Sequence, residues 1–270
     1  MQGALVAIGG AEDRYEEKFI LNKFFQLAGG KQARVVILPS ASSDERTGST
    51  YQRIFREFGA ASVEVLPLFR REDAEDPAVA EQLKAASGIF MTGGDQNRIM
   101  AVLESTQALD AIVEANGRGT VVGGTSAGAA ALSNPMIAGG MRGSLARSGM
   151  TRISTGIGLA RGFIIDQHFS QRERLGRLLY AVILHPECLG LGVDEDTAAI
   201  IKLAEGEVEV IGRGTVTIVD GSSVKMFNPA SVPDKSPIVY SGMLLHSFTH
   251  GCRFSIKDRT LVMNRRVHGE

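Results

Sequence analysis

The sequence predicts an α/β fold in which a mostly parallel sheet lies between two layers of helices. Short apolar runs rich in β-branched residues alternate with amphipathic segments of roughly ten to fifteen residues, a rhythm typical of βαβ units. The runs are apolar almost throughout, as expected of strands that are buried on both faces. Paired glycines between the segments indicate tight turns where the strands end. We therefore predict a three-layer α/β/α sandwich.

The first half of the chain contains five predicted strands with predicted helices between them. The strands are residues 4–8, 34–38, 63–66, 88–91 and 120–122. Helical spacing of apolar residues covers residues 15–28, 49–58, 77–86 and 107–116. Gly29, Gly59 and Gly117 directly follow three of these helices, where glycine commonly ends a helix. This order of elements predicts a doubly wound sheet.

The second half begins with an irregular segment and then returns to regular structure. Residues 139–150 hold four glycines with little apolar periodicity, so we expect a mobile surface loop. A strand at residues 163–166, a long helix from about residue 171 to 184 and a strand at residues 189–193 follow. Short alternating segments after that predict C-terminal antiparallel strands. Because no Pro-rich or Ser-rich linker divides the chain, we expect one domain over residues 1–270.

The composition favours a cytoplasmic protein that acts on a small molecule or a protein-sized partner. The 29 basic and 30 acidic residues nearly cancel, so no global field favours nucleic acid or an anionic membrane. The longest apolar run, residues 178–184, is far shorter than the roughly 20 residues that span a bilayer. The first basic residue, Arg14, follows the apolar residues 4–8, which is the reverse of a signal peptide. Two cysteines are too few for a disulfide framework.

A candidate nucleophile lies in the segment Gly124-Thr125-Ser126-Ala127-Gly128, between a predicted strand and a helix-forming run. This G-x-S-x-G pattern is typical of a nucleophile elbow, in which a strained serine projects its hydroxyl above the sheet. The Ala127 N–H would then donate to an oxyanion, and we expect Gly94 to supply the second donor. The alternative is a glycine-rich turn with an incidental serine.

A serine nucleophile needs a base, and His168 is the best placed of the five histidines. It follows the strand at residues 163–166, at the sheet edge where α/β proteins collect their ligands. His185 ends a helix and His268 lies near the chain end, so both are expected to be structural or solvated. The alternative for His168 is a structural histidine with satisfied hydrogen bonds.

The acid that would orient His168 remains open among Asp194, Glu195 and Asp196, which follow the strand at residues 189–193. Acidic turns are commonly just solvated. The chain order of nucleophile, histidine and acid differs from the order in α/β-hydrolases. An ordinary esterase or lipase is therefore disfavoured.

Several segments resemble the cyanophycinases, a family of serine peptidases that is related to the aspartyl dipeptidases. The resemblance extends from the first strand to about Leu203 and is most specific around His168. It is carried by Ile8-Gly9-Gly10-Ala11-Glu12-Asp13, Thr92-Gly93-Gly94-Asp95-Gln96, the elbow, Asp166-Gln167-His168-Phe169-Ser170-Gln171-Arg172-Glu173-Arg174-Leu175-Gly176-Arg177-Leu178 and Gly192-Val193-Asp194-Glu195-Asp196-Thr197-Ala198.

The resemblance implies a fold, a triad and a substrate. The fold would be similar to the class I glutamine amidotransferase domain, with Ser126 as nucleophile, His168 as base and Glu195 as orienting acid. The substrate would be cyanophycin, a poly-aspartate backbone that carries arginine in isopeptide linkage on each β-carboxyl. The reaction would hydrolyse the backbone to β-Asp-Arg dipeptides, without a cofactor or a metal. A second copy of the chain could complete a homodimer.

Charged residues beside the triad suit such a substrate. Guanidinium forks bind carboxylates bidentately, and three arginines are predicted at the start of the helix after His168. Asp166 or Asp95 could be the counter-charge for the substrate guanidinium. Gln167 is also expected to contact the substrate. The alternative is a solvated basic helix face. The expected substrate-binding residues are Asp95, Asp166, Gln167, Arg172, Arg174 and Arg177.

Other functions are less well supported by the sequence. A dipeptidase that acts on aspartyl or isoaspartyl bonds and a non-catalytic binding domain are the alternatives. Glutamine amidotransferase chemistry is disfavoured because it uses cysteine where this chain has Ser126. The histidines and cysteine within residues 246–252 lack a second cluster for zinc. Glu12 and Asp13 disfavour a phosphate loop after Gly9-Gly10.

Overall fold

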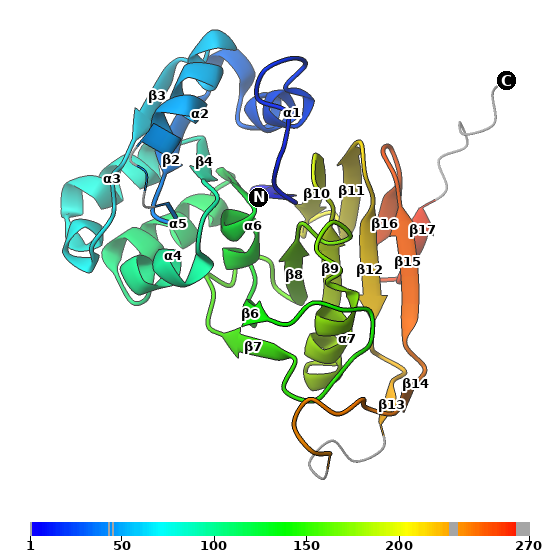
Figure 1. Ribbon diagram of the computed structural model, residues 1–270. Coiled ribbons are helices and arrows are strands. Elements are labelled where there is room, and N and C mark those ends of the chain that lie inside the picture. The colour runs from blue at the N-terminus through cyan, green and yellow to red at the C-terminus, as the bar shows by residue number, and fades with distance from the viewer. Residues whose placement is uncertain (1, 43, 45, 227–231, 263–270) are drawn as a thin grey trace, which may run out of the picture.

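The computed structural model describes residues 2–42, 44, 46–226 and 232–262. It confirms the expected α/β class (Figure 1). The five strands of the first half are all parallel and lie side by side. Their order is β3 (Ser62–Val65), β2 (Arg34–Leu38), β4 (Gly88–Met91), β5 (Val121–Thr125) and β1 (Leu5–Ile8).

Antiparallel strands from the C-terminal part continue this sheet beyond β1, as predicted. The chain adds β10 (Thr197–Lys202), β11 (Glu207–Gly212), β16 (Arg253–Ser255) and β17 (Thr260–Val262), which completes a nine-stranded sheet. Within the segment of residues 246–252, residues 246–248 lie in a strand and residues 250–251 lie in a turn.

A second sheet, which the sequence pattern did not indicate, has four strands. They are β8 (Phe163–Gln167), β9 (Leu189–Val193), β12 (Val216–Asp220) and β15 (Leu244–Phe248), of which β8 and β9 are parallel. Apolar side chains of both sheets form one continuous hydrophobic core. This shared core supports the expected single domain, which remains a prediction.

Alternate residues of each parallel strand point to opposite faces, and helices cover both. Val6 and Ile8 pack with α1 (Phe19–Leu27) and α2 (Arg46–Glu57). Leu5 and Ala7 belong to the core that includes helices of the other layer. Those helices are α3 (Pro77–Ala85), α4 (Gln96–Leu103), α5 (Gln107–Gly117) and α6 (Ala127–Ala131). The three layers follow from the period of two in buried strands.

The remaining elements complete the part of the molecule around the second sheet. Helix α7 (Leu175–Leu184) packs on β9 and lies in front of it in Figure 1. Two small ribbons are formed by β6 (Met136–Gly140) with β7 (Thr151–Ser154), and by β13 (Lys225–Met226) with β14 (Tyr240–Ser241). Short 3₁₀ turns occupy Gly30–Gln32 and Arg71–Glu75.

Three helix starts differ from the prediction. Helix α2 begins at Arg46 instead of residue 49. Helix α1 begins at Phe19 instead of residue 15, because the Asp13 carboxylate accepts from the N–H groups of Tyr15, Glu16 and Lys18 in a turn. Helix α7 begins at Leu175 instead of residue 171. Helix α4, only eight residues long, was not predicted.

The expected surface loop over residues 139–150 is found for residues 141–149, which lie outside the named helices and strands and include the 60% exposed Leu145, while its mobility stays a prediction. Gly139 and Gly140 belong to β6. Ala146 and Met150 are buried. The Gly143 N–H donates to the Glu173 carbonyl at 2.7 Å, and the Gly143 carbonyl accepts from Gly176 at 2.8 Å. Backbone hydrogen bonds therefore tie this segment to the start of α7. Within the described ranges, every helix is too short or too polar to cross a bilayer.

Candidate active site

Ser126, His168 and Glu195 each follow the carboxyl end of a strand. Ser126 follows β5 of the large sheet, whereas His168 and Glu195 follow β8 and β9 of the second sheet. The site therefore lies where the two sheets meet. The structure brings together three residues that are separated by 42 and 27 positions along the chain.

The elbow around Ser126 has the strained backbone that the G-x-S-x-G pattern predicts. Ser126 has φ 53° and ψ −111°, a conformation that costs energy for a residue with a side chain. A Cβ on Gly124 would lie 2.4 Å from the Gly128 carbonyl carbon, so this turn requires glycine. The Ser126 N–H donates to the Ile8 carbonyl at 2.9 Å, which fixes the elbow against β1.

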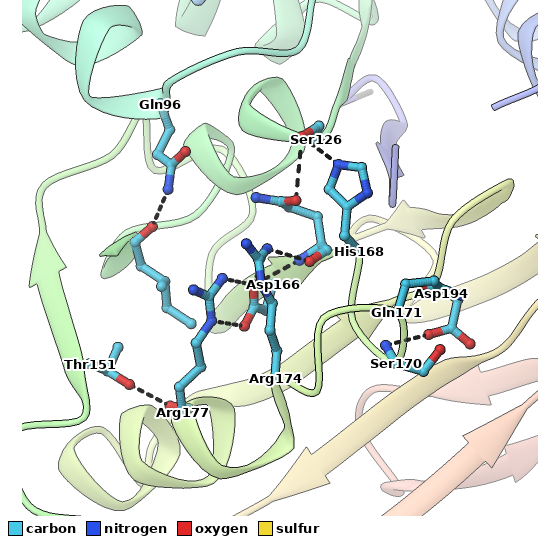
Figure 2. Close-up of polar contacts among 12 residues, drawn as sticks. Gln96, Ser126, Thr151, Asp166, His168, Ser170, Gln171, Arg174, Arg177 and Asp194 are labelled. Atoms are coloured by element: carbon cyan, nitrogen blue, oxygen red, sulfur yellow. Dashed lines mark hydrogen bonds and ion pairs between the residues drawn. The ribbon is translucent and has the colours of Figure 1, made fainter. Parts of the chain in front are cut away.

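The three side chains form a continuous hydrogen-bonded relay. Ser126 Oγ lies 3.0 Å from His168 Nε2, and His168 Nδ1 lies 2.5 Å from Glu195 Oε1. Ser126 Oγ also lies 3.3 Å from Gln167 Oε1 (Figure 2). The distances suit a proton transfer from Ser126 to His168, with Glu195 holding the ring by its other nitrogen.

The surroundings of His168 lower the pKa of its imidazole below the ordinary value of 6.5. Burial is the largest cause, because it disfavours the charged ring. Glu195 opposes this effect, while the positive charges of Arg172 and Arg174 add to it. The net result favours a neutral imidazole, which is the form that accepts a proton.

Among the three candidate acids, Glu195 is the one that contacts His168. Asp194 is buried and accepts from the Ser170 N–H at 2.9 Å and from the Thr215 N–H at 3.0 Å. Asp196 accepts from the Asp13 N–H at 3.0 Å. The two neighbours therefore hold loops, and the geometry supports the choice of Glu195 that the resemblance implied.

The oxyanion donors expected at Ala127 and Gly94 stay predictions. Ala127 begins α6, and the first N–H groups of a helix have no partner within the helix. Gly93 faces the nucleophile, since a Cβ built on it would lie 3.4 Å from Ser126 Cβ. Gly94, at φ +146°, faces the Ala41 carbonyl. The loop after β4 is thus in contact with the elbow.

Arg177 and Asp166 are bound to each other in the interior. Both side chains are about 95% buried or more. Arg177 Nε donates to Asp166 Oδ2 at 2.6 Å, and its Nη2 donates to Oδ1 (Figure 2). This pairing argues against our expectation that either residue contacts the substrate directly. The reason is that both charged groups face each other in the interior, with 5% and 1% of their side chains exposed.

Arg172 and Arg174 lie in the loop before α7, which corrects their expected place at the start of the helix. Arg174 Nη1 donates to the Gln167 carbonyl at 2.5 Å and lies 3.4 Å from Asp166. In the described part of the chain, Arg172 makes no ion pair. Burial and the nearby arginines, despite Asp166, lower the pKa of Arg174 to about 10. The excess of positive charge around Arg172 and Arg174 favours the binding of an anionic ligand in this loop.

The other expected contact, Asp95, is exposed and caps helix α4. Its Oδ1 accepts from the Asn97 N–H at 2.8 Å. Sequence reasoning did not single out Gln171, whose side-chain oxygen accepts from the Glu195 N–H at 3.0 Å. Its position three residues after His168 was the only sequence feature that could have indicated this role.

An open cavity of about 370 Å³ borders Ser170 and Arg174.

The chain matches known peptidases over most of its length. The model of peptidase family S51 matches residues 5–211. A cyanophycinase from Trichormus variabilis is 41% identical over 96% of this chain and 87% of its own length. A cyanophycinase from Geminocystis herdmanii is also 41% identical, over 95% of each chain.

Two solved structures share the fold at low sequence identity. A peptidase from an acI-B1 Actinobacterium has a TM-score of 0.68 at 22% identity, over 94% of this chain and 97% of its own. A putative peptidase E protein from Listeria monocytogenes has a TM-score of 0.55 at 17% identity, over 79% of this chain and 100% of its own. The expected fold class is therefore found in structures of peptidases.

Proposed function

Because the chain belongs to peptidase family S51, we propose that it is a serine-type exopeptidase that hydrolyses the backbone of cyanophycin to β-Asp-Arg dipeptides. The observation that carries the catalytic part is the relay from Ser126 through His168 to Glu195. The substrate is supported by the 41% identity to cyanophycinases along nearly the whole chain.

The relay performs acyl transfer in two steps. Ser126 Oγ attacks the scissile carbonyl carbon while its proton passes to His168 Nε2, and the N–H groups of Ala127 and Gly94 bind the resulting oxyanion. His168 then protonates the leaving amine, which breaks the C–N bond and leaves an acyl ester on Ser126. A water molecule attacks this ester, His168 takes its proton, and the acid product leaves.

The positive loop beside the relay suits the charge of the substrate. Every cyanophycin unit carries the free carboxylate of its arginine as well as a guanidinium. Arg172, which makes no ion pair in the described ranges, is the group that binds this carboxylate. Asp95, exposed at the start of α4, remains the candidate for the substrate guanidinium.

The setting of the reaction is part of the same proposal. We place the protein in the cytoplasm, because Cys188 and Cys252 are both free thiols in the structure. The polymer is the macromolecular partner, and neither nucleic acid nor a membrane is required. A homodimer remains a prediction.

The test is the clearing of a turbid cyanophycin suspension by the purified protein. The wild type is expected to clear the suspension, and Ser126→Ala at the same concentration is not. Casein serves as a control polymer and should remain intact. A wild type that leaves cyanophycin turbid, or a Ser126→Ala variant that clears it equally fast, would refute the proposal.

A further inference from the structure

The last residue of β1 and the loop that follows it contact all three segments that carry the catalytic residues. Three consecutive carbonyl groups make these contacts. The Ile8 carbonyl accepts from the Ser126 N–H at 2.9 Å, and the Gly9 carbonyl accepts from the His168 N–H at 2.7 Å. The Gly10 carbonyl accepts from the N–H of Asp196, the residue after Glu195, at 2.9 Å. One short segment thus sets the backbone position of each member of the relay.

The glycines in this loop are required by close approach to the same groups. A Cβ on Gly10, which has φ +98°, would lie 2.4 Å from Cε1 of the His168 ring. A Cβ on Gly9 would lie 1.9 Å from the Asp194 carbonyl oxygen. The imidazole therefore packs directly on the loop backbone, which limits how the ring can move.

Glu12, two residues further on, adds a side-chain link to the nucleophile. Glu12 as a whole residue is only 4% exposed. It accepts from the hydroxyl of Thr125, the residue before Ser126, and from the hydroxyl of Tyr51 on α2, both at 2.5 Å. A buried carboxylate needs such donors, since an unpaired one is costly. The pair of hydroxyls holds the end of β5 where the elbow begins.

We propose that Glu12 is a positioning residue for Ser126, and that the segment of residues 8–13 sets the geometry of the whole relay. Glu12 does not touch the reacting atoms. It acts through Thr125, whose fixed side chain leaves the strained Ser126 backbone little freedom to relax. This inference rests on the proposed role of Ser126 as nucleophile. An error of about 1 Å in such a geometry can cost about a hundredfold in rate.

The test measures how fast an alkyl fluorophosphonate labels Ser126. In this reaction the serine oxygen bonds to phosphorus, fluoride leaves, and His168 takes the serine proton. We expect Thr125→Val and Glu12→Gln to lower the labelling rate at saturating probe by about tenfold, with the half-saturating probe concentration unchanged. Tyr51→Phe, which leaves the bond to Thr125 in place, should have a smaller effect.

A matched control is Thr120→Val, just before the other end of the same strand. Thr120 is also buried, and its hydroxyl donates one hydrogen bond, to the Ala86 carbonyl at 2.7 Å. This variant should lose stability and keep the wild-type labelling rate. An equal loss of rate in Thr120→Val, or wild-type rates in Thr125→Val and Glu12→Gln, would show that Glu12 only stabilises the fold. If Thr125→Val does not fold, Glu12→Gln and Tyr51→Phe decide the question.

The labelling experiment also separates this inference from the proposed function. A wild type that is labelled at Ser126 but leaves cyanophycin intact would refute the substrate and leave the positioning role testable. A wild type that is not labelled at Ser126 would refute the nucleophile, and with it the positioning role.

Discussion

The catalytic relay and the pair of Arg177 with Asp166 are neighbours that use charge in opposite ways. In the relay, the Glu195 side chain is 35% exposed and His168 faces the nucleophile. In the pair, both side chains are almost completely buried and bind each other. Asp166 of the pair and His168 of the relay are only two residues apart at the end of β8, so a short stretch of sequence holds a structural and a reactive group side by side. The difference teaches that burial and partners, not residue type, decide which charge meets a ligand.

The largest effect is expected from removing the nucleophile. Ser126→Ala should lower kcat by a factor on the order of 10³ or more, because the acyl ester can no longer form. The thermal unfolding midpoint should stay near the wild-type value, since the substitution removes one oxygen. Initial rates on cyanophycin and circular dichroism measure the two quantities. Near-normal turnover in the folded variant would contradict the relay.

The acid of the relay should have the next largest effect. Glu195→Gln should lower kcat by about a hundredfold or more, because the amide cannot stabilise the imidazolium that forms on His168. Asp194→Asn is the matched control, since Asp194 binds loop N–H groups and does not contact His168. It should lower stability more than kcat. The opposite pattern would assign the acid to Asp194.

Breaking the buried pair of Arg177 and Asp166 should lower the free energy of unfolding. Arg177→Ala leaves the Asp166 carboxylate buried without its bidentate partner, and breaking such a pair costs about 3–5 kcal/mol. Urea unfolding of the variant measures this loss. A variant with wild-type stability and a raised KM would instead show that Arg177 binds the substrate.

Replacing Arg172 should affect activity and leave stability unchanged, which is the reverse of the effect expected for Arg177. Arg172→Ala should lower kcat/KM on cyanophycin by about tenfold to a hundredfold, because it removes a charge-assisted bond to the substrate carboxylate. Its unfolding free energy should not change. A minimal ester without carboxylate or guanidinium should be hydrolysed almost as fast as by the wild type. Equal losses on both substrates would mean that Arg172 supports the catalytic geometry.

The smallest effect is a shift in the pH dependence. Catalysis needs neutral His168, whose pKa is lowered from 6.5, mainly by burial. As the pH falls, kcat/KM should therefore decline with a midpoint below 6.5. Arg172→Gln removes a positive charge that disfavours the imidazolium, so the pKa and the midpoint should rise. A midpoint that stays fixed or falls would contradict this electrostatic link.

The sequence predicted the parts of the site that depend on local chain geometry. The elbow was predictable because a serine at positive φ needs small neighbours such as Gly124 and Gly128. The parallel strands were predictable because strands that are buried on both faces leave an apolar pattern. The family resemblance added the choice of Glu195, which residue patterns alone left open.

Contacts between distant segments left no such pattern. The sequence does not indicate that the Arg177 side chain binds Asp166 in the interior. Buried and exposed arginines of a helix cannot be distinguished by sequence until the packing of the helix is known. Likewise, the link from Glu12 to Thr125 joins residues 113 positions apart. The strand at the start of the predicted loop over residues 139–150 was also missed, because its glycines suggest a turn while here they allow close backbone contact: a Cβ on Gly140 would lie 2.6 Å from the Met150 carbonyl oxygen.

The mass of the first soluble product released from cyanophycin tests the central claim most directly. The proposed backbone exopeptidase releases β-Asp-Arg dipeptides from the start of the reaction, and mass spectrometry of early time points would detect them. Free arginine as the first product would mean that the isopeptide bond is cleaved instead. Long oligomers at early times would mean internal cleavage of the backbone. Either result would contradict the proposed reaction, whereas dipeptides that appear with the wild type and not with Ser126→Ala would establish it.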